Sequence, residues 1–291
     1  MGSLKEIKTR ILSVKSTRKI TSAMKMVASA KLRKAEKLIQ NMLPYEERLE
    51  LILQDFLNSK EEGIPLIYTQ EREVNRQAVL LFASNTSLCG PFNNNVVKKF
   101  REFMQQEGTV GKQNIDIYCF GKKIAKSLAR ENFDVLESFD ELSDKPDFNQ
   151  ISMLADKLAA LFLSRNIDRV VCIYHQFISK GHQKLVTENF LPVRKQVVED
   201  EPEKKKTIHQ FYIEPDRDTM RADLLPRFLR IQLYRILLDS NASEHAARML
   251  AMQTATDNAD DLLVELTLDY NKTRQQAITA ELLDIIGGSF R

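Results

Sequence analysis

Two uninterrupted stretches, one at each end of the chain, constrain what this sequence can fold into. No glycine or proline occurs between Pro226 and Gly287, and between Gly2 and Gly63 the only one is Pro44. These two residue types interrupt helices most strongly, so each stretch can form one long helix. Helices in globular proteins typically span about 8–20 residues, and longer periodic runs are typical of coiled coils. We therefore expect a coiled coil, with two ordinary bundle helices as the alternative.

The first stretch has the three-four spacing of apolar residues that places one stripe along a helix. The stripe begins with Leu4, Ile7, Ile11 and Val14. We expect it to slip at Ile20 and to resume through Met24, Val27 and Ala30. A strict heptad follows, formed by Leu38, Met42, Tyr45, Leu49, Ile52 and Phe56. A helix over residues 4–57 would be about 80 Å long, with a kink or a local break expected at Pro44.

The last stretch repeats this spacing over about 90 Å of expected helix. The stripe consists of Leu224, Phe228, Ile231, Arg235, Leu238, Ala242, His245, Met249, Met252, Thr256, Ala259, Leu263, Leu266 and Tyr270. Pro226 is tolerated near a helix start, and Gly287-Gly288 is a natural stop. Alanine, methionine and threonine make up much of the seam, so the helices would approach closely and hold each other weakly.

The two ends carry opposite charge. Residues 1–40 contain eleven lysine or arginine residues and two acidic ones, whereas residues 239–286 contain nine acidic residues and three basic ones. This difference favours pairing of the first helix with the last. A nucleic-acid-binding rod is the alternative for the basic helix, and it predicts a steep loss of binding with salt. The absence of any aromatic residue before Tyr45 that could stack on a base speaks against it.

The middle of the chain has a different pattern, typical of alternating strands and helices. Short runs rich in β-branched and aromatic residues predict buried strands at 77–83, 115–120 and 169–174. Helical stretches are expected at 94–106, 122–131 and 149–163. Such alternation predicts a mostly parallel sheet. Two further strands, at 184–190 and 207–213, are expected to form an edge hairpin joined by the charged loop 199–206.

The predicted fold class is therefore α/β, with a long coiled coil formed by the N- and C-terminal helices and a central Rossmann-like α/β domain. The corresponding boundaries are 1–58 for the first coiled-coil helix, 75–213 for the central domain and 218–287 for the last helix.

The central domain lacks the motifs of a nucleotide-binding enzyme. Residues 83–90 contain no G-x-G-x-x-G, and neither Gly111 nor Gly121 begins a phosphate-binding loop. Cys89 follows a strand, where thiols can be activated, but buried packing is the favoured interpretation. The histidines are expected at the surface or at interfaces and not as metal ligands: His175, His182, His209 and His245. We expect no catalytic residue, no cofactor and no metal; an enzyme with an unrecognised site remains an alternative, which turnover by the isolated chain would favour.

Composition and cysteine spacing indicate the cellular compartment of the chain. With 43% hydrophobic and 29% charged residues it has the composition of a folded soluble protein. No run of about 18 apolar residues could span a membrane, and the N-terminus lacks the apolar core of a signal peptide. Three scattered cysteines without a C-x-x-C pair indicate a reducing compartment.

Two long segments resemble the gamma subunit of F-type ATP synthases. The opening of that family resembles residues 7–36, IKTRILSVKSTRKITSAMKMVASAKLRKAE. Its end resembles residues 243–288, SEHAARMLAMQTATDNADDLLVELTLDYNKTRQQAITAELLDIIGG. Its mid-chain motif resembles SLCG at 87–90, followed by Phe92-Asn93. The chain departs from that motif at Asn85-Thr86-Ser87, where Asp-Arg-Gly is usual, and at Pro91, where glycine is usual, so no contact role is carried over for this turn.

The resemblance implies a function. It implies a central rotor shaft, without a catalytic site of its own, that couples transmembrane proton flow to ATP synthesis or hydrolysis by rotating inside the hexamer of alpha and beta subunits. The implied partners are that hexamer, the epsilon subunit and the ring of c subunits, with the membrane contacted only through the ring and with no nucleic acid. The absence of a transit peptide and of an insertion bearing a cysteine pair favours a bacterial chain, peripheral on the cytoplasmic face of the plasma membrane.

The resemblance also implies contact residues. Shaft contacts with the alpha and beta subunits are expected at Met24, Lys25, Arg248, Arg274, Gln275, Thr279 and Glu281. An apolar bearing tip is expected at Leu282, Leu283, Ile285 and Ile286. Tyr212 and Glu214 are expected to face the ring and the epsilon subunit. A structural coiled-coil adaptor that binds partners without rotating remains the main alternative.

Overall fold

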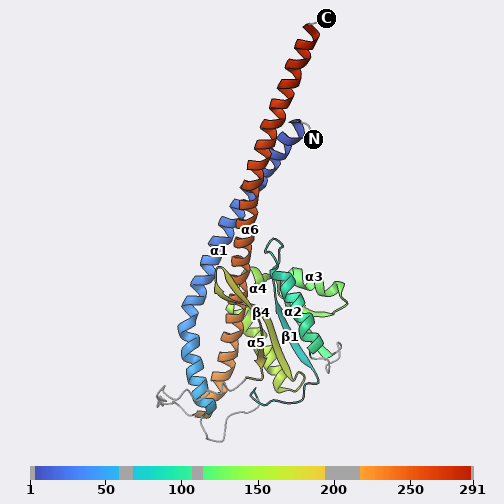
Figure 1. The fold of residues 1–291 in the computed structure, drawn as a ribbon. Coiled ribbons are helices and arrows are strands. Elements are labelled where there is room, and N and C mark those ends of the chain that lie inside the picture. Colours follow the sequence, from blue (N-terminus) through green and yellow to red (C-terminus); the bar gives the residue numbers. More distant parts are fainter. Residues whose placement is uncertain (1–3, 59–67, 107–113, 194–216, 290–291) are drawn as a thin grey trace, which may run out of the picture. The chain divides into compact units, whose positions relative to one another are not determined.

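The chain forms two compact units that share two long helices. The computed structural model describes residues 4–58, 68–106, 114–193 and 217–289 (Figure 1). One unit comprises residues 1–30 and 248–291, and the other comprises residues 31–247. Helices α1 (Leu4–Asn58) and α6 (Arg217–Ser289) each contribute to both units. The long terminal helices and the α/β class are confirmed, whereas the three domain boundaries stay a prediction.

Among the described residues of the unit 31–247, five strands form one sheet. Its strand order is β3-β2-β1-β4-β5. The strands are β1 (Gln77–Phe82), β2 (Ile115–Phe120), β3 (Val135–Ser138), β4 (Arg169–Ser179) and β5 (His182–Leu191). The first four run parallel, and β5 is antiparallel to β4 at one edge. Gln77 of β1 lies opposite Ile115 of β2 and Arg169 of β4. The mostly parallel sheet is as predicted.

Helices cover both faces of this sheet, which gives three layers (Figure 1). The shorter helices are α2 (Phe92–Gln106), α3 (Lys122–Arg130), α4 (Asp140–Asp144) and α5 (Phe148–Leu163). Helices α2 and α3 pack on the face that bears Val79 and Leu81, and α5 and α6 pack on the face that bears Leu80 and Phe82. Because both faces are covered, all six residues of β1 are buried, which explains why its sequence is continuously apolar.

The edge of the described sheet includes a pairing that the sequence did not predict. The partner of β5 is β4, to which it is joined by the turn around Lys180-Gly181. The strand expected at 207–213 and the loop at 199–206 lie outside the described residues. Strand β4 also extends past Tyr174 to Ser179, beyond the apolar run that predicted it. The sequence missed β3 because it has only four residues, which alternate between half-buried and exposed.

The unit of residues 1–30 and 248–291 is an antiparallel helix pair. The Thr21 and Thr256 hydroxyls lie 2.8 Å apart in a hydrogen bond, and Arg18 Nη1 lies 2.8 Å from Asp260 Oδ1. Buried side chains between the helices include Thr21, Ala28, Met252 and Ala259. Most are small, so the two backbones approach closely, as the seam composition predicted.

The expected slip of the first stripe at Ile20 is wrong. Ile20 and Val27 are exposed, whereas Thr21 and Ala28 are buried and Lys25 is half-buried. The three-four spacing therefore continues without a shift, with polar residues at seam positions that an apolar count passes over. The predicted heptad beyond it is wrong at one position in the same way. Tyr45, which was predicted to face the core, is exposed, and the neighbouring Glu46 pairs with Arg235.

Both long helices continue past the residues that were expected to interrupt them. Helix α1 continues through Pro44, so no local break occurs there. Apolar residues on both sides of Pro44, Met42 and Leu49, contact the core of the larger unit, which holds the helix across the lost hydrogen bond. Helix α6 likewise continues through Gly287-Gly288 to Ser289.

Gly121 occupies a position that other residues would strain. Its φ of 111° lies in a region that side chains rarely adopt, and a Cβ there would lie 2.5 Å from the carbonyl oxygen of Ala83. This close approach follows from the Ala83 N–H, which donates to the Phe120 carbonyl at 2.8 Å. The turn after β2 therefore requires glycine.

Gly121→Ala is expected to lower the free energy of unfolding by about 2–4 kcal/mol, because it adds backbone strain to a clash with backbone atoms. Urea titration followed by circular dichroism measures the change. Gly181→Ala is the matched control, since nothing lies within 4 Å of a Cβ built there. Equal stability of the two variants would contradict the role assigned to Gly121.

Candidate functional site

The carboxyl edge of the sheet is the first place to look for a ligand site. In open α/β sheets, ligands bind beyond the carboxyl ends of the strands where the strand order reverses. Here that point lies between β1 and β4. Asn241 and Ser243 of α6 reach this edge: Asn241 Nδ2 donates to the Ser143 carbonyl at 2.8 Å, and Ser243 Oγ donates to the His175 carbonyl at 3.0 Å.

The space at this edge is filled. A cavity bounded by Phe82, Phe120, Ser143, Asn241 and their neighbours admits no water-sized sphere. Ser143 Oγ donates to the Ala83 carbonyl at 2.9 Å and so closes the end of β1. The protein's own side chains therefore fill the part of this edge that lies beyond the ends of β1 and β2.

The turn after β1 uses its polar residues for structure. The Ser84 N–H donates to Asn93 Oδ1 at 2.9 Å, which ties the turn to the start of α2. Asn85 Nδ2 donates to the Asp140 carbonyl at 2.8 Å, and Asn85 Oδ1 accepts from the Lys122 N–H at 3.0 Å. Asn85, the first residue of the departure from the family motif, thus connects the turn to α3 and α4.

In the described part of the chain, the three cysteines and two of the histidines are buried. Cys89 is buried, as favoured, and burial raises the pKa of Cys119 to about 12. His175 is buried against Phe92, with ring centroids 4.3 Å apart, and burial lowers its pKa to about 4. His245 is also buried, so a surface position is wrong for both histidines. His182 is exposed, and His209 lies outside the described residues.

The predicted shaft contacts fall in the smaller unit. Met24, Lys25 and Arg248 are half-buried on the paired helices. The second set is exposed on α6: Arg274, Gln275, Thr279 and Glu281. The two cross-helix pairs set the alignment of the antiparallel helices. Because both helices rise equally per residue, Leu4 lies opposite about residue 274. The first set of predicted contacts therefore lies where α1 and α6 are paired, and the second set lies on α6 at or beyond the described start of α1.

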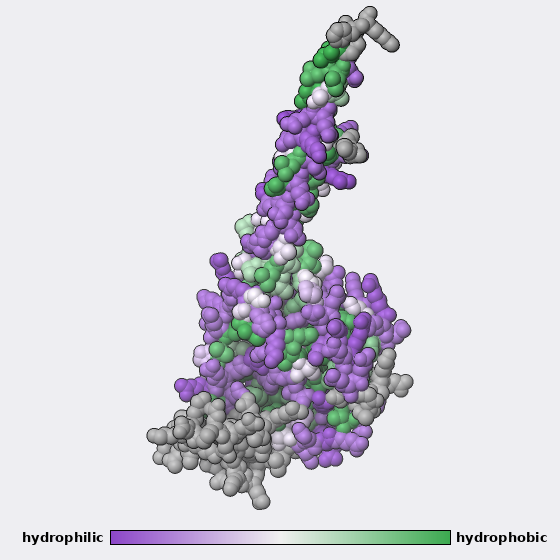
Figure 2. Space-filling model, viewed as in Figure 1, coloured by the Kyte–Doolittle hydropathy of each residue, from purple (hydrophilic) through white to green (hydrophobic). Residues whose placement is uncertain are grey.

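The predicted tip is an exposed apolar surface. Leu282, Leu283, Ile285 and Ile286 expose between 52% and 68% of their surface. Figure 2 shows hydrophobic side chains gathered near the end of α6, next to the grey terminal residues. In Figure 1 this end of α6 extends past the N-terminal end of α1 within the same unit. The four tip residues therefore lie beyond the described start of α1 and are not part of the seam between the two helices. Tyr212 and Glu214 lie outside the described residues.

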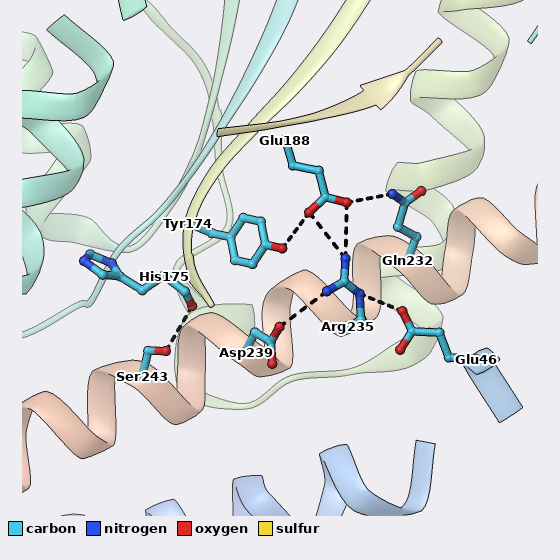
Figure 3. A network of polar contacts seen from close by, with 8 residues as sticks. All are labelled: Glu46, Tyr174, His175, Glu188, Gln232, Arg235, Asp239 and Ser243. Atoms are coloured by element: carbon cyan, nitrogen blue, oxygen red, sulfur yellow. Dashed lines mark hydrogen bonds and ion pairs between the residues drawn. The ribbon is translucent and has the colours of Figure 1, made fainter. Parts of the chain in front are cut away.

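A buried charge cluster, which the sequence did not predict, lies in the larger unit (Figure 3). Arg235 of α6 contacts three carboxylates: Nε lies 2.7 Å from Glu46 Oε1 of α1, Nη2 lies 3.2 Å from Glu188 Oε1 of β5, and Nη1 lies 3.6 Å from Asp239 Oδ2. Glu188 also accepts from the Tyr174 hydroxyl at 2.6 Å. The sequence signal was available, because arginine is an unusual residue at a core position of a helix stripe.

Burial sets the protonation of this cluster, which we call the Arg235 cluster. Burial raises the pKa of Asp239 to about 7; Arg235 opposes the rise, and the carboxylates of Glu46 and Glu188 add to it. Burial also raises the pKa of Glu46. Three carboxylates around one guanidinium leave excess negative charge, which adds to the effect of burial on the pKa of Asp239, the least exposed of the three.

An open groove of about 740 Å³ lies between α1, α5 and α6 in the same unit. Its walls are mainly apolar, and Asp156, Arg227 and Arg230 add charge to its lining. No group of three or more potential metal ligands occurs in residues 4–58, 68–106, 114–193 and 217–289. None of the helices described there is long and apolar enough to cross a membrane.

Comparison with known proteins covers the whole length of the chain. A family model described as ATP synthase matches residues 3–290. The ATP synthase gamma chain of Bacteroides fragilis is 52% identical over 289 residues, which are 99% of each chain. The gamma chain of Christiangramia forsetii is 40% identical over 99% of this chain and 98% of its own. A chain in the OSCP/F1/c-ring structure of Euglena gracilis mitochondrial ATP synthase has the same fold, with a TM-score of 0.65 at 19% identity, covering 99% of this chain and 93% of that one.

Asp239→Asn is expected to remove a pH dependence of stability. The Asp239 pKa rises from 3.8 to about 7 on folding, so its contribution is fully present below the lower value and is lost as the pH rises through the higher one. The stability of the wild type relative to the variant should therefore fall by up to about 1 kcal/mol per pH unit between pH 5 and 7.

Urea titrations of both proteins at half-unit pH intervals measure this difference. The depressed pKa of His175 also changes stability in this range, but with the opposite sign, since its contribution is lost as the pH falls from 6.5 towards 4. That change is common to both proteins and cancels. A stability difference that is independent of pH would show that Asp239 is ionised throughout.

Proposed function

Because the chain belongs to the ATP synthase gamma chain family, we propose that it is the rotating central shaft of a bacterial F-type ATP synthase. In this role it couples transmembrane proton flow to ATP synthesis or hydrolysis inside a hexamer of alpha and beta subunits. The chain would contribute no catalytic site, no cofactor and no metal ligand of its own.

The observation that carries this proposal is the set of large hydrophobic side chains that the helix pair exposes among its charged residues. Several large hydrophobic side chains are exposed on it: Leu12, Ile20, Met26, Val27, Leu250, Leu262, Val264, Leu268 and Ile278, together with the four residues of the tip. An isolated soluble helix pair would present polar residues on these faces. The four adjoining tip residues form an apolar surface of the kind that marks an interaction site, and a surrounding partner would cover both this tip and the other exposed hydrophobic side chains.

Asymmetry provides the coupling in this proposal. A ligand or partner shifts an equilibrium only if it contacts the alternative states unequally. The helix pair is asymmetric, because α6 extends beyond the described start of α1 and because α1 is basic along its first turns. As the shaft turns, each beta subunit would meet a different surface of it and would change its nucleotide affinity accordingly.

We assign the contact residues within this proposal. Met24, Lys25 and Arg248 would contact the alpha and beta subunits at mid-shaft. Arg274, Gln275, Thr279 and Glu281 would provide polar contacts further along α6, and the four apolar tip residues would turn within an apolar bearing. The half-buried position of the first group and the exposure of the other two support this assignment.

The remaining partners follow from the family. A solved chain of the same fold comes from a structure titled as the central stalk and c-ring of Tetrahymena thermophila mitochondrial ATP synthase, and we propose that this chain likewise contacts a c-ring and an epsilon subunit. Tyr212 and Glu214 are proposed for those contacts. The complex would lie on the cytoplasmic face of the bacterial plasma membrane, with this chain peripheral to it.

Rotation can be tested directly. Lys126 is exposed on α3, so Lys126→Cys provides a thiol for a bead, whereas Cys89, Cys119 and Cys172 are buried. With the alpha and beta subunits of the same bacterium fixed to glass, ATP should drive continuous rotation of the bead in one direction. A complex that hydrolyses ATP while the bead stays still would establish the adaptor alternative. Beads without ATP provide the control.

Serine at all four tip positions is expected to weaken retention of the chain in the complex. Each side chain would lose about 1 kcal/mol of burial free energy, estimated from half-exposed residues that become covered. Gel filtration of diluted complexes measures the loss, and Leu136→Ser, an exposed leucine of β3, provides the control. Retention equal to that of the wild type would exclude an apolar bearing at the tip.

A further inference from the structure

We propose that Arg235 is a positioning residue for torque transfer: the Arg235 cluster fixes α1 against α6 and the edge of the sheet, so that these elements turn together. This inference rests on the proposed rotor function. All residues of the cluster belong to the unit of residues 31–247. Both helices leave this unit and continue into the helix pair, so torque that passes along either of them must be shared between them here.

The cluster joins three structural elements through one side chain. Glu46 comes from α1, Glu188 comes from β5, and Arg235 and Asp239 come from α6 (Figure 3). Glu188 is itself held by the Tyr174 hydroxyl of β4 at 2.6 Å and by Gln232 Nε2 of α6 at 2.9 Å. Sliding or turning of α1 relative to α6 would separate Glu46 from Arg235.

The type of interaction is what suits this role. A guanidinium is a rigid plane whose N–H groups point in fixed directions. Arg235 Nη2 donates to both carboxylate oxygens of Glu188, at 3.2 and 3.3 Å, whereas Nε meets Glu46 of α1 as an ion pair at 2.7 Å without a hydrogen bond. The other contacts of α1 in this unit are largely apolar, from Met42, Leu49, Ile52 and Leu53. Apolar burial is non-directional and tolerates sliding. An exposed ion pair between Glu36 and Lys180, at 3.9 Å, adds little.

Stability alone does not account for the cluster. The side chains of Arg235, Glu46 and Asp239 are only 9–19% exposed, so all have lost most of their hydration. Replacing such a buried ion group with apolar residues of similar size is often neutral or stabilising. The excess of carboxylates makes the arrangement still less favourable. What such a cluster can add is specificity, because it favours one relative position of α1, α6 and β5 over others.

The test replaces the cluster while keeping its packing. In one variant, Arg235→Met, Glu46→Leu and Asp239→Leu remove the charges, and Glu188→Gln keeps a partner for Tyr174 and Gln232. The control is Arg230→Met with Asp156→Leu, an ion pair on the same helix that joins α6 to α5 at 2.8 Å and does not involve α1. Each chain is assembled into the complete membrane complex, in inverted vesicles.

ATP hydrolysis, ATP-driven acidification of the vesicles and the melting temperature of the isolated chain are measured together. The cluster variant should melt within about 3 °C of the wild type or higher. Its acidification per ATP hydrolysed should fall by about threefold or more, the size of effect expected when a directly coupled pair is removed. The Arg230 control should keep the wild-type ratio. A purely structural cluster would instead lower the melting temperature and leave the ratio of any assembled complex unchanged, which would overturn the proposal.

A second variant covers the case in which the four substitutions prevent folding. Arg235→Lys keeps the charge but loses the planar set of donors, and it should also lower acidification per ATP while assembling normally. An unchanged ratio in this variant would overturn the proposal. Failure of the proposed function is a different result: the wild-type complex itself would then show neither rotation nor acidification.

Discussion

The packing of α6 against one face of the sheet is the constraint on which the other features of this protein depend. Leu233, Ile236 and Leu237 of α6 are fully or almost fully buried in the same core cluster as Phe82 of β1 and Tyr174 of β4. A helix fixed there by apolar contacts carries its next two turns to the carboxyl edge of the sheet, where Asn241 and Ser243 bind backbone carbonyls. The same contacts therefore build the core and fill the part of this edge that lies beyond the ends of β1 and β2.

Helix α6 also passes through two different environments. Between residues 224 and 247 it packs against the sheet and α5, and it pairs with Glu46 of α1, so most of its side chains are buried. From residue 248 onward its described cross-helix contacts are with α1, and its outer face bears exposed leucine, valine and isoleucine. One continuous helix thus supplies a fixed attachment in one unit and a surface for partners in the other.

Periodicity predicted most elements because the environment of each is simple. Strands β1 and β2 are buried on both faces, so they appear as apolar runs, and both begin where the sequence predicted. Predictions were wrong where polar residues occupy buried positions. The seam at Thr21 and Lys25, and the contact made by Glu46, use polar groups that an apolar count cannot find. The pairing of β5 with β4 was missed because a strand pattern does not identify its neighbour.

Sequence patterns alone are enough to predict the two long helices, the mostly parallel sheet between them and, through the terminal segments, the family. These depend on local spacing and on residue identity, which are present in the chain before it folds. Only the tertiary structure decided that α6 closes the carboxyl edge, and that Glu46, Glu188 and Asp239 meet around Arg235. Glu46, Glu188 and the Arg235–Asp239 pair are far apart in the sequence and belong to three different elements. Their contacts, and the raised pKa of Asp239 that burial causes, arise only when packing removes water from between them.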